Sequence, residues 1–291
     1  MRKRPPLSFP QLLVCISLLC ALTGALTLVA SHTSPDRHFE QFTSQLFQEE
    51  MTGNTLNMHY TIADPKTFGI SEYEPVLPIY HSDQPEDSKE HCSDLLHRLD
   101  RIDPDRLSPE NAYTYRLLHR SLENDLALAD FPYYNEPLSP SSGMQSQLPV
   151  LLAEYTFRTK RDVTDYLALL DQIDDYFASL LLYEQEKAAA GFFMPACSSE
   201  KVRKQCDTIV TTEELAQGTH FLQTTFEDRL SELQKQGLFT PEETASLIKT
   251  NNRLLVTVVQ PAYAALSEGL HSLETSTNAD STASETTTNT T

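Results

Sequence analysis

Apolar residues recur at steps of three and four along most of the chain after residue 34, a spacing that gathers them on one face of an α-helix. The longest predicted helix spans residues 159–190, with a single stripe made of Val163, Tyr166, Leu167, Leu170, Ile173, Phe177, Leu180 and Leu181. This almost entirely helical periodicity predicts an all-α, multi-helix bundle.

Helix starts and interruptions divide the region further. Capping boxes at Thr211–Glu214 and Thr240–Glu243 predict the starts of two long helices that form an antiparallel pair, the second of them kinked at Pro261. Residues 54–85 and 131–149 each contain four prolines and no sustained period. We therefore predict an irregular connection in the first stretch and an ordered loop in the second.

The amino terminus predicts an export signal or a membrane anchor over residues 1–30. Residues 2–4 are basic, and the uncharged run 12–30 has the length needed to cross a bilayer. The positive-inside rule then places the body outside the cytoplasm. We expect a single-pass membrane protein that contacts the membrane through residues 12–30, or a secreted one if the chain is cleaved at Val29-Ala30-Ser31.

The predicted helical domain covers residues 34–274. Beyond Glu274 the composition changes to Thr, Ser and Asn without a large apolar side chain. Such a segment buries too little surface to offset the entropy of ordering. Residues 275–291 are therefore predicted to be disordered.

Charge and cysteine content restrict the partners and cross-links. Apart from the basic residues 2–4, 19 basic side chains face 41 acidic ones. This balance opposes binding to nucleic acid, which needs clustered Lys and Arg. Three cysteines lie beyond the apolar run, namely Cys92, Cys197 and Cys206. An oxidising compartment allows a disulfide, and Cys197 with Cys206 would close a short loop.

No motif in the sequence carries recognisable chemistry. None of the nine histidines has another four residues further on, and the chain contains no Gly-x-Ser-x-Gly, Walker or dinucleotide motif. We assign no catalytic residue, no metal ligand and no cofactor. The distinctive polar and aromatic positions of the central loop either line a ligand cleft or cap the bundle; they are Tyr133, Tyr134, Asn135, Gly143 and Gln145.

Four phrases, at residues 54–70, 132–170, 184–195 and 258–273, resemble the amino-terminal half of the bacterial family known as domain of unknown function 885, which is similar to gluzincin-type zinc peptidases. The resemblance implies a mostly helical protein about twice this length, with His-Glu-x-x-His in its second half. It also implies that these helices form a wall and lid of the substrate cleft, with the loop 132–149 facing it. Zinc is expected only with that second half.

Three hypotheses remain open from the sequence. The chain is an incomplete, exported and membrane-anchored zinc-peptidase-like protein that is not catalytic alone. Alternatively, it is a binding or scaffold module for a peptide-like ligand, without chemistry. In the third hypothesis it is one half of a split hydrolase, with the carboxy-terminal half as its partner. Whether the chain acts as an enzyme is not decided by these residues.

Overall fold

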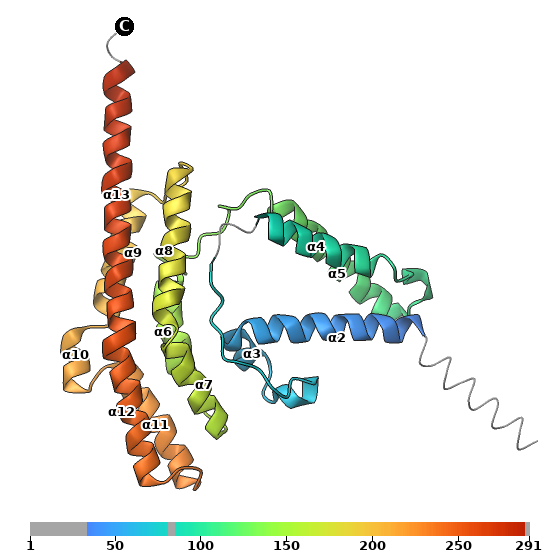
Figure 1. Ribbon diagram of the computed structural model, residues 1–291, viewed down its shortest axis with the longest axis horizontal. Coiled ribbons are helices and arrows are strands. Elements are labelled where there is room, and N and C mark those ends of the chain that lie inside the picture. Colours follow the sequence, from blue (N-terminus) through green and yellow to red (C-terminus); the bar gives the residue numbers. More distant parts are fainter. Residues whose placement is uncertain (1–33, 81–84, 289–291) are drawn as a thin grey trace, which may run out of the picture. The chain divides into compact units, whose positions relative to one another are not determined.

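The computed structural model describes residues 34–80 and 85–288 (Figure 1). Within these ranges the backbone forms helices and connecting loops and no strand, so the protein is all-α as predicted. The chain forms two compact units. Of the described residues, one unit contains 34–47 and 88–127, and the other contains 48–80, 85–87 and 128–288.

The first unit consists of the amino-terminal part of α2 (Pro35–Gly53) with α4 (Pro85–Leu99), the short η2 (Pro104–Arg106) and α5 (Pro109–Leu128). Its core is formed by Phe39, Phe42, Leu95, Leu99, Tyr115 and Leu122. The carboxylate of Asp36 accepts hydrogen bonds from Ser108 N at 2.9 Å and Asn111 Nδ2 at 2.7 Å. These bonds lower the pKa of Asp36 and join the start of α2 to the start of α5.

The second unit holds the larger core and the long carboxy-terminal helix. Its elements are α3 (Thr55–Thr61), η1 (Pro65–Phe68), α6 (Met144–Glu154), α7 (Lys160–Leu170), α8 (Ile173–Ala189), α9 (Ala196–Ile209), α10 (Thr212–Gln217), α11 (Phe221–Lys235), α12 (Pro241–Leu254), the π-helical η3 (Leu255–Val259) and α13 (Gln260–Thr288). Helix α13 packs against α8 and α9, and α11 packs against α12 (Figure 1). A loop of five residues joins α11 to α12, so this pair is antiparallel, as predicted.

The predicted capping box at the start of α12 is confirmed. Thr240 Oγ1 accepts the Glu243 N–H at 3.2 Å, and the Glu243 carboxylate accepts the Thr240 N–H at 2.7 Å. At the place where a kink was predicted, before Pro261, the helix contains the π-helical turn η3. Pro261 has no N–H to donate, and in this wider turn the Gln260 N–H reaches Leu255 O.

Four predicted boundaries are wrong. The cap at Thr211 starts only the short α10, which ends at the left-handed Gly218, and the long α11 begins separately at Phe221. The helix predicted over 159–190 is broken into α7 and α8, where Gln172 accepts a hydrogen bond from Leu77 N at 3.1 Å and donates one to Pro75 O at 2.9 Å. The predicted loop 131–149 ends early, because α6 begins at Met144 and contains Pro149. The irregular connection 54–85 contains α3, whose start is capped by the side chain of Asn54.

The two ends of the chain differ in what the structure tests. The apolar run 12–30, predicted to cross the membrane, lies outside the described residues. Across the described ranges, no helix combines the length and the apolar character of a membrane span. At the other end, α13 is helical to Thr288, and the disorder predicted for residues 275–291 stays a prediction. Neither Gly nor Pro follows Gly269, and the helical backbone therefore meets no strong breaker.

The disulfide allowed by the sequence is also corrected. Cys197 and Cys206 both lie on α9 and are unbonded, Cys197 exposed and Cys206 buried. Nine residues of helix rise about 13 Å, well beyond the roughly 7 Å that a disulfide can bridge between Cα atoms. One straight helix cannot bring the two thiols together.

Candidate functional site

The five loop residues predicted to line a cleft separate into groups with different surroundings. Tyr133 packs near two aromatic rings, with centroid distances of 6.1 Å to Tyr183 and 6.0 Å to Phe192. Asn135 offers its backbone oxygen to the Tyr183 hydroxyl at 3.1 Å. The side chain of Tyr134, in contrast, is 71% exposed. This part of the loop is held against α8.

The other two predicted residues fix the start of α6. Gly143 is its N-cap, and Gln145 is fully buried. Gln145 Nε2 donates to Ser139 O at 2.6 Å and to Gln205 Oε1 at 2.8 Å. Its backbone oxygen accepts the Tyr263 hydroxyl at 2.8 Å, which ties the loop to α9 and α13. None of the five residues lines either of the two cavities described next; a role in a cleft stays a prediction.

Next to this loop, α8 carries a buried pair of opposite charges. Glu184 and Lys187 are both fully buried, with Glu184 Oε1 3.6 Å from Lys187 Nζ. Lys187 lies closer to the half-exposed Glu136, at 2.9 Å. Burial raises the pKa of Glu184 to about 7, and the Lys187 charge opposes this only in part.

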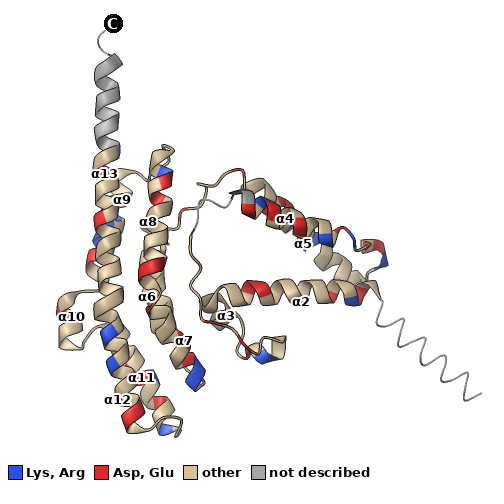
Figure 2. Cartoon of the chain, in the orientation of Figure 1, with Lys and Arg blue, Asp and Glu red and all other residues tan. Residues whose placement is uncertain are grey.

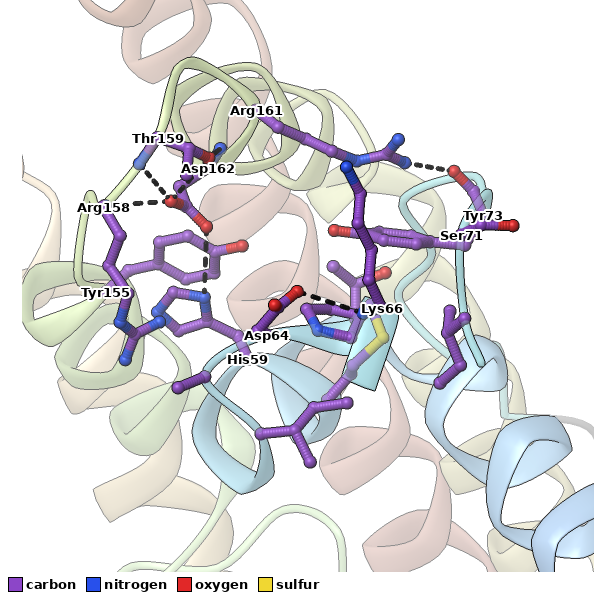
Figure 3. Close-up of a pocket in the computed structure, with 16 residues that line it drawn as sticks. His59, Asp64, Lys66, Ser71, Tyr73, Tyr155, Arg158, Thr159, Arg161 and Asp162 are labelled. Atoms are coloured by element: carbon purple, nitrogen blue, oxygen red, sulfur yellow. Dashed lines mark hydrogen bonds and ion pairs between the residues drawn. The ribbon is translucent and has the colours of Figure 1, made fainter. Parts of the chain in front are cut away.

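A cavity with a volume of about 500 Å³ lies within the second unit (Figure 3). One wall is formed by α3, η1 and the segment that follows η1. The other is formed by residues 155–162, between the end of α6 and the first turn of α7. This volume falls within the range of small-molecule sites. A second hollow of about 510 Å³ adjoins it at Tyr73 and Arg161, two residues that line both.

His59 connects the two walls of the cavity. Its Nε2 accepts a hydrogen bond from Thr156 N at 3.0 Å, which leaves the ring proton on Nδ1, 3.9 Å from Asp162 Oδ1. The ring stacks on Tyr155 with centroids 3.6 Å apart. Burial, helped by the nearby charge of Arg158, lowers the pKa of His59 to about 4. His59 is therefore neutral at physiological pH.

Asp162 is occupied by the start of α7. Its Oδ2 accepts hydrogen bonds from Arg158 N at 2.9 Å, Thr159 N at 2.6 Å and Thr159 Oγ1 at 2.9 Å. The Thr159 side chain in turn accepts from Asp162 N, which completes a capping box. The carboxylate fixes this wall of the cavity.

A network of Tyr73, Asp165 and Arg161 closes the opposite side. The Tyr73 hydroxyl donates to Asp165 Oδ2 at 2.6 Å, and Arg161 Nε lies 3.4 Å from the same oxygen. The Arg161 guanidinium also donates to Tyr73 O and lies 3.8 Å from the centre of its ring. Burial raises the pKa of Asp165, while the Tyr73 hydrogen bond and the Arg161 charge work in the other direction.

Beneath the cavity, Arg229 of α11 supports the end of α6. Its guanidinium donates to Leu152 O at 3.0 Å, a carbonyl that also accepts the Tyr155 N–H, and to Tyr155 O just beyond the last helical turn. The same group lies over the rings of Phe157 at 4.5 Å and Tyr166 at 5.2 Å. This contact determines where Tyr155, and with it His59, is placed.

The described residues do not fit zinc, the metal that the family resemblance implies. No three His, Cys, Asp or Glu side chains converge on a common point in the described ranges. Both ring nitrogens of His59 are engaged, one by Thr156 N and the other facing Asp162. Asp162 itself is committed to its cap. The cavity is thus a polar site without a set of metal ligands.

Sequence reasoning missed this cavity. The first wall lies in the stretch interpreted as an irregular connection, and its key contact joins residues 97 apart in sequence. A usable signal was present in the Thr159–Asp162 capping box, which marks the start of α7 on the second wall.

The fold and the site define the class of protein: an all-α domain with a polar cavity that holds a neutral histidine. The chain belongs to the family described as "Bacterial protein of unknown function (DUF885)", which matches residues 66–287. This confirms the family that the sequence resembles, while the correspondence to its amino-terminal half and the likeness to zinc peptidases stay predictions. No curated protein sequence matches the chain.

Among solved structures of similar fold is the "putative lipoprotein from Colwellia psychrerythraea". The TM-score is 0.68 at 15% sequence identity, and the match covers 83% of this chain. It covers 42% of the other chain, so the present chain spans less than half the length of that relative. At this identity the likeness establishes the fold alone.

Proposed function

We propose that this chain supplies the helical, non-catalytic portion of a zinc-peptidase-like hydrolase, whose metal ligands and general base come from a second portion. The observation that carries the proposal is the fold match to a chain of which this one spans 42%. The family resemblance, in which His-Glu-x-x-His belongs to the second half, supports the same division. The second portion is either continuous with this chain or a separate polypeptide.

The proposal includes a place outside the cytoplasm. The basic residues 2–4 followed by the apolar run 12–30 support export with the amino terminus as a membrane anchor. A structure of similar fold that is described as a lipoprotein agrees with an exported protein.

A second candidate is a ligand-binding module without chemistry. The cavity of about 500 Å³ around His59 favours it, because its walls come entirely from this chain. The two candidates differ in whether a catalytic portion exists, and this can be tested directly.

The test is to sequence the DNA beyond codon 291 and then compare two preparations. We expect an in-frame or adjacent coding segment with His-Glu-x-x-His. The 291-residue chain should bind no stoichiometric zinc by elemental mass spectrometry and cleave no fluorogenic peptide. The chain joined to the downstream segment should bind one zinc and gain cleavage that a chelator abolishes. The proposal is overturned if no such segment exists, or if the 291-residue chain alone binds zinc and cleaves peptides.

A further inference from the structure

Three cationic side chains line the His59 cavity of a chain whose net charge is −19. They are Lys66 from η1, Arg158 before α7, and Arg161 in its first turn. Arg161 has partners in Tyr73 and Asp165. Lys66 and Arg158 are exposed, and neither side chain forms an ion pair with any described residue. Figure 2 shows acidic and basic residues along most helices, so what distinguishes these three cations is the cavity that they share.

Two carboxylates, Asp64 and Asp162, line the same cavity and keep their negative charge, so the three cations leave its lining with one positive charge in excess. Asp162 accepts three hydrogen bonds from Arg158 N and Thr159, and Asp64 Oδ1 accepts the backbone N–H of Lys66 at 3.1 Å. Both are therefore helix caps. His59 adds no positive charge, since its pKa is lowered to about 4. Two cations without partners thus border a cavity whose acidic groups are already engaged (Figure 3).

The rest of the lining is apolar or aromatic. Met58, Ile62 and Ile70 contribute aliphatic surface, and Tyr155 contributes a ring stacked on His59. A cavity of about 500 Å³ with apolar walls and a few charged groups suits a ligand of the size of a capped amino acid or a short peptide end. The charge required of that ligand is negative.

We propose that the His59 cavity binds an organic carboxylate with an apolar side group, and that Lys66 and Arg158 supply the positive charges that recognise it. The free ligand can be a small acid or the carboxy terminus of a peptide, which share this chemistry. The inference goes beyond the proposed function, since it requires neither zinc nor a second portion. Failure to bind the acid would leave the hydrolase proposal intact, and the absence of a catalytic segment would leave this site intact.

The experiment measures binding to the full 291-residue chain by isothermal titration calorimetry. The probes are N-acetyl-L-leucine, its uncharged amide, N-acetyl-Ala-Ala-Leu and inorganic phosphate. We expect the acid to bind about tenfold or more tightly than the amide, the factor that corresponds to about 1.4 kcal/mol. Tighter binding of the peptide would identify a peptide end as the source of the carboxylate, and equal binding would identify a small acid.

Two variants and two matched controls locate the site. Lys66→Gln and Arg158→Gln should each weaken binding of the acid about tenfold and leave binding of the amide unchanged. Lys201→Gln and Arg101→Gln remove the same charges from exposed positions outside the cavity and should change neither. Circular dichroism and thermal melting verify that each variant is folded.

Three results would overturn the inference. The first is equal affinity for acid and amide. The second is unchanged binding in folded Lys66→Gln and Arg158→Gln proteins. The third is phosphate binding as strong as that of the acid and equally sensitive to the two substitutions, which would mean a general anion site that does not use the apolar wall.

Discussion

The buried carboxylate of Glu184 makes the stability of this protein depend on pH in a predictable direction. Neither of its oxygens accepts a hydrogen bond from a described residue, and Lys187 Nζ, at 3.6 Å, is shared with Glu136. Burial therefore raises the pKa of Glu184 from its ordinary value of 4.5 to about 7. We therefore expect the free energy of unfolding of the native protein to fall as the pH rises. In Glu184→Gln this fall should be absent.

Proton linkage gives the sign and the size of this change in the free energy of unfolding. Below pH 4.5 Glu184 is protonated in both the folded and the unfolded chain, and its contribution to stability is fully present. Between pH 4.5 and 7 the unfolded chain ionises first, so the free energy of unfolding falls, and above pH 7 it levels off. A pKa raised from 4.5 to about 7 corresponds to roughly 3 kcal/mol. For a folded region of this size, that is a shift of roughly 6–12 °C in Tm.

The assay is urea and thermal unfolding of the native chain and Glu184→Gln at pH 4.5 and pH 8. The substitution leaves Lys187 with Glu136 as its one carboxylate partner, which can lower stability equally at both pH values. Comparing the change in the free energy of unfolding between the two pH values in each protein cancels this pH-independent cost. The free energy of unfolding should fall by roughly 3 kcal/mol more in the native protein than in the variant. Glu200→Gln, at an exposed position on α9, should behave like the native chain. Parallel pH profiles for native and Glu184→Gln proteins would refute the reasoning.

Two further substitutions test the cavity wall and the central loop by urea unfolding. Tyr73→Phe removes the hydroxyl that donates to Asp165 at 2.6 Å, so the free energy of unfolding should fall by about 1.5–3 kcal/mol. The same change at the exposed Tyr134 should alter the free energy of unfolding by less than about 0.5 kcal/mol. Equal effects of the two substitutions would contradict the buried network. In Gly143→Ala a Cβ atom would lie 2.3 Å from Ser139 N and 2.6 Å from Ser139 O. Because these are backbone atoms, we expect the free energy of unfolding to fall by about 1–3 kcal/mol or more. An unchanged free energy of unfolding would mean that the loop can move away from α6.

The helices were predictable where the determining contacts are local. The apolar stripes and the Thr240–Glu243 cap depend on residues three or four apart, and the structure has helices at these places. Prediction failed at residues 171–172, where the stripe continues but the helix ends. There the side chain of Gln172 bonds to the backbone of residues 75–77, almost a hundred residues away in the sequence.

The candidate site could not be predicted from the sequence for the same physical reason. The contact of His59 with Thr156 and that of Tyr73 with Asp165 each join segments more than ninety residues apart. Each of these residues looks ordinary in its own segment. The family resemblance directed attention to the loop 132–149, whereas the polar cavity lies between α3 and the first turn of α7.

The sequence by itself determined an all-α chain, its capped helices, its acidic surface and its family, because periodicity, capping and composition are properties of neighbouring residues. Only the tertiary structure decided which side chains are buried together. It is burial that makes His59 neutral and raises the pKa of Glu184. The same packing engages Asp162 in a helix cap and leaves Lys66 and Arg158 without ion-pair partners among the described residues. Only when the helices pack are side chains removed from water and brought close to groups that are distant in the sequence.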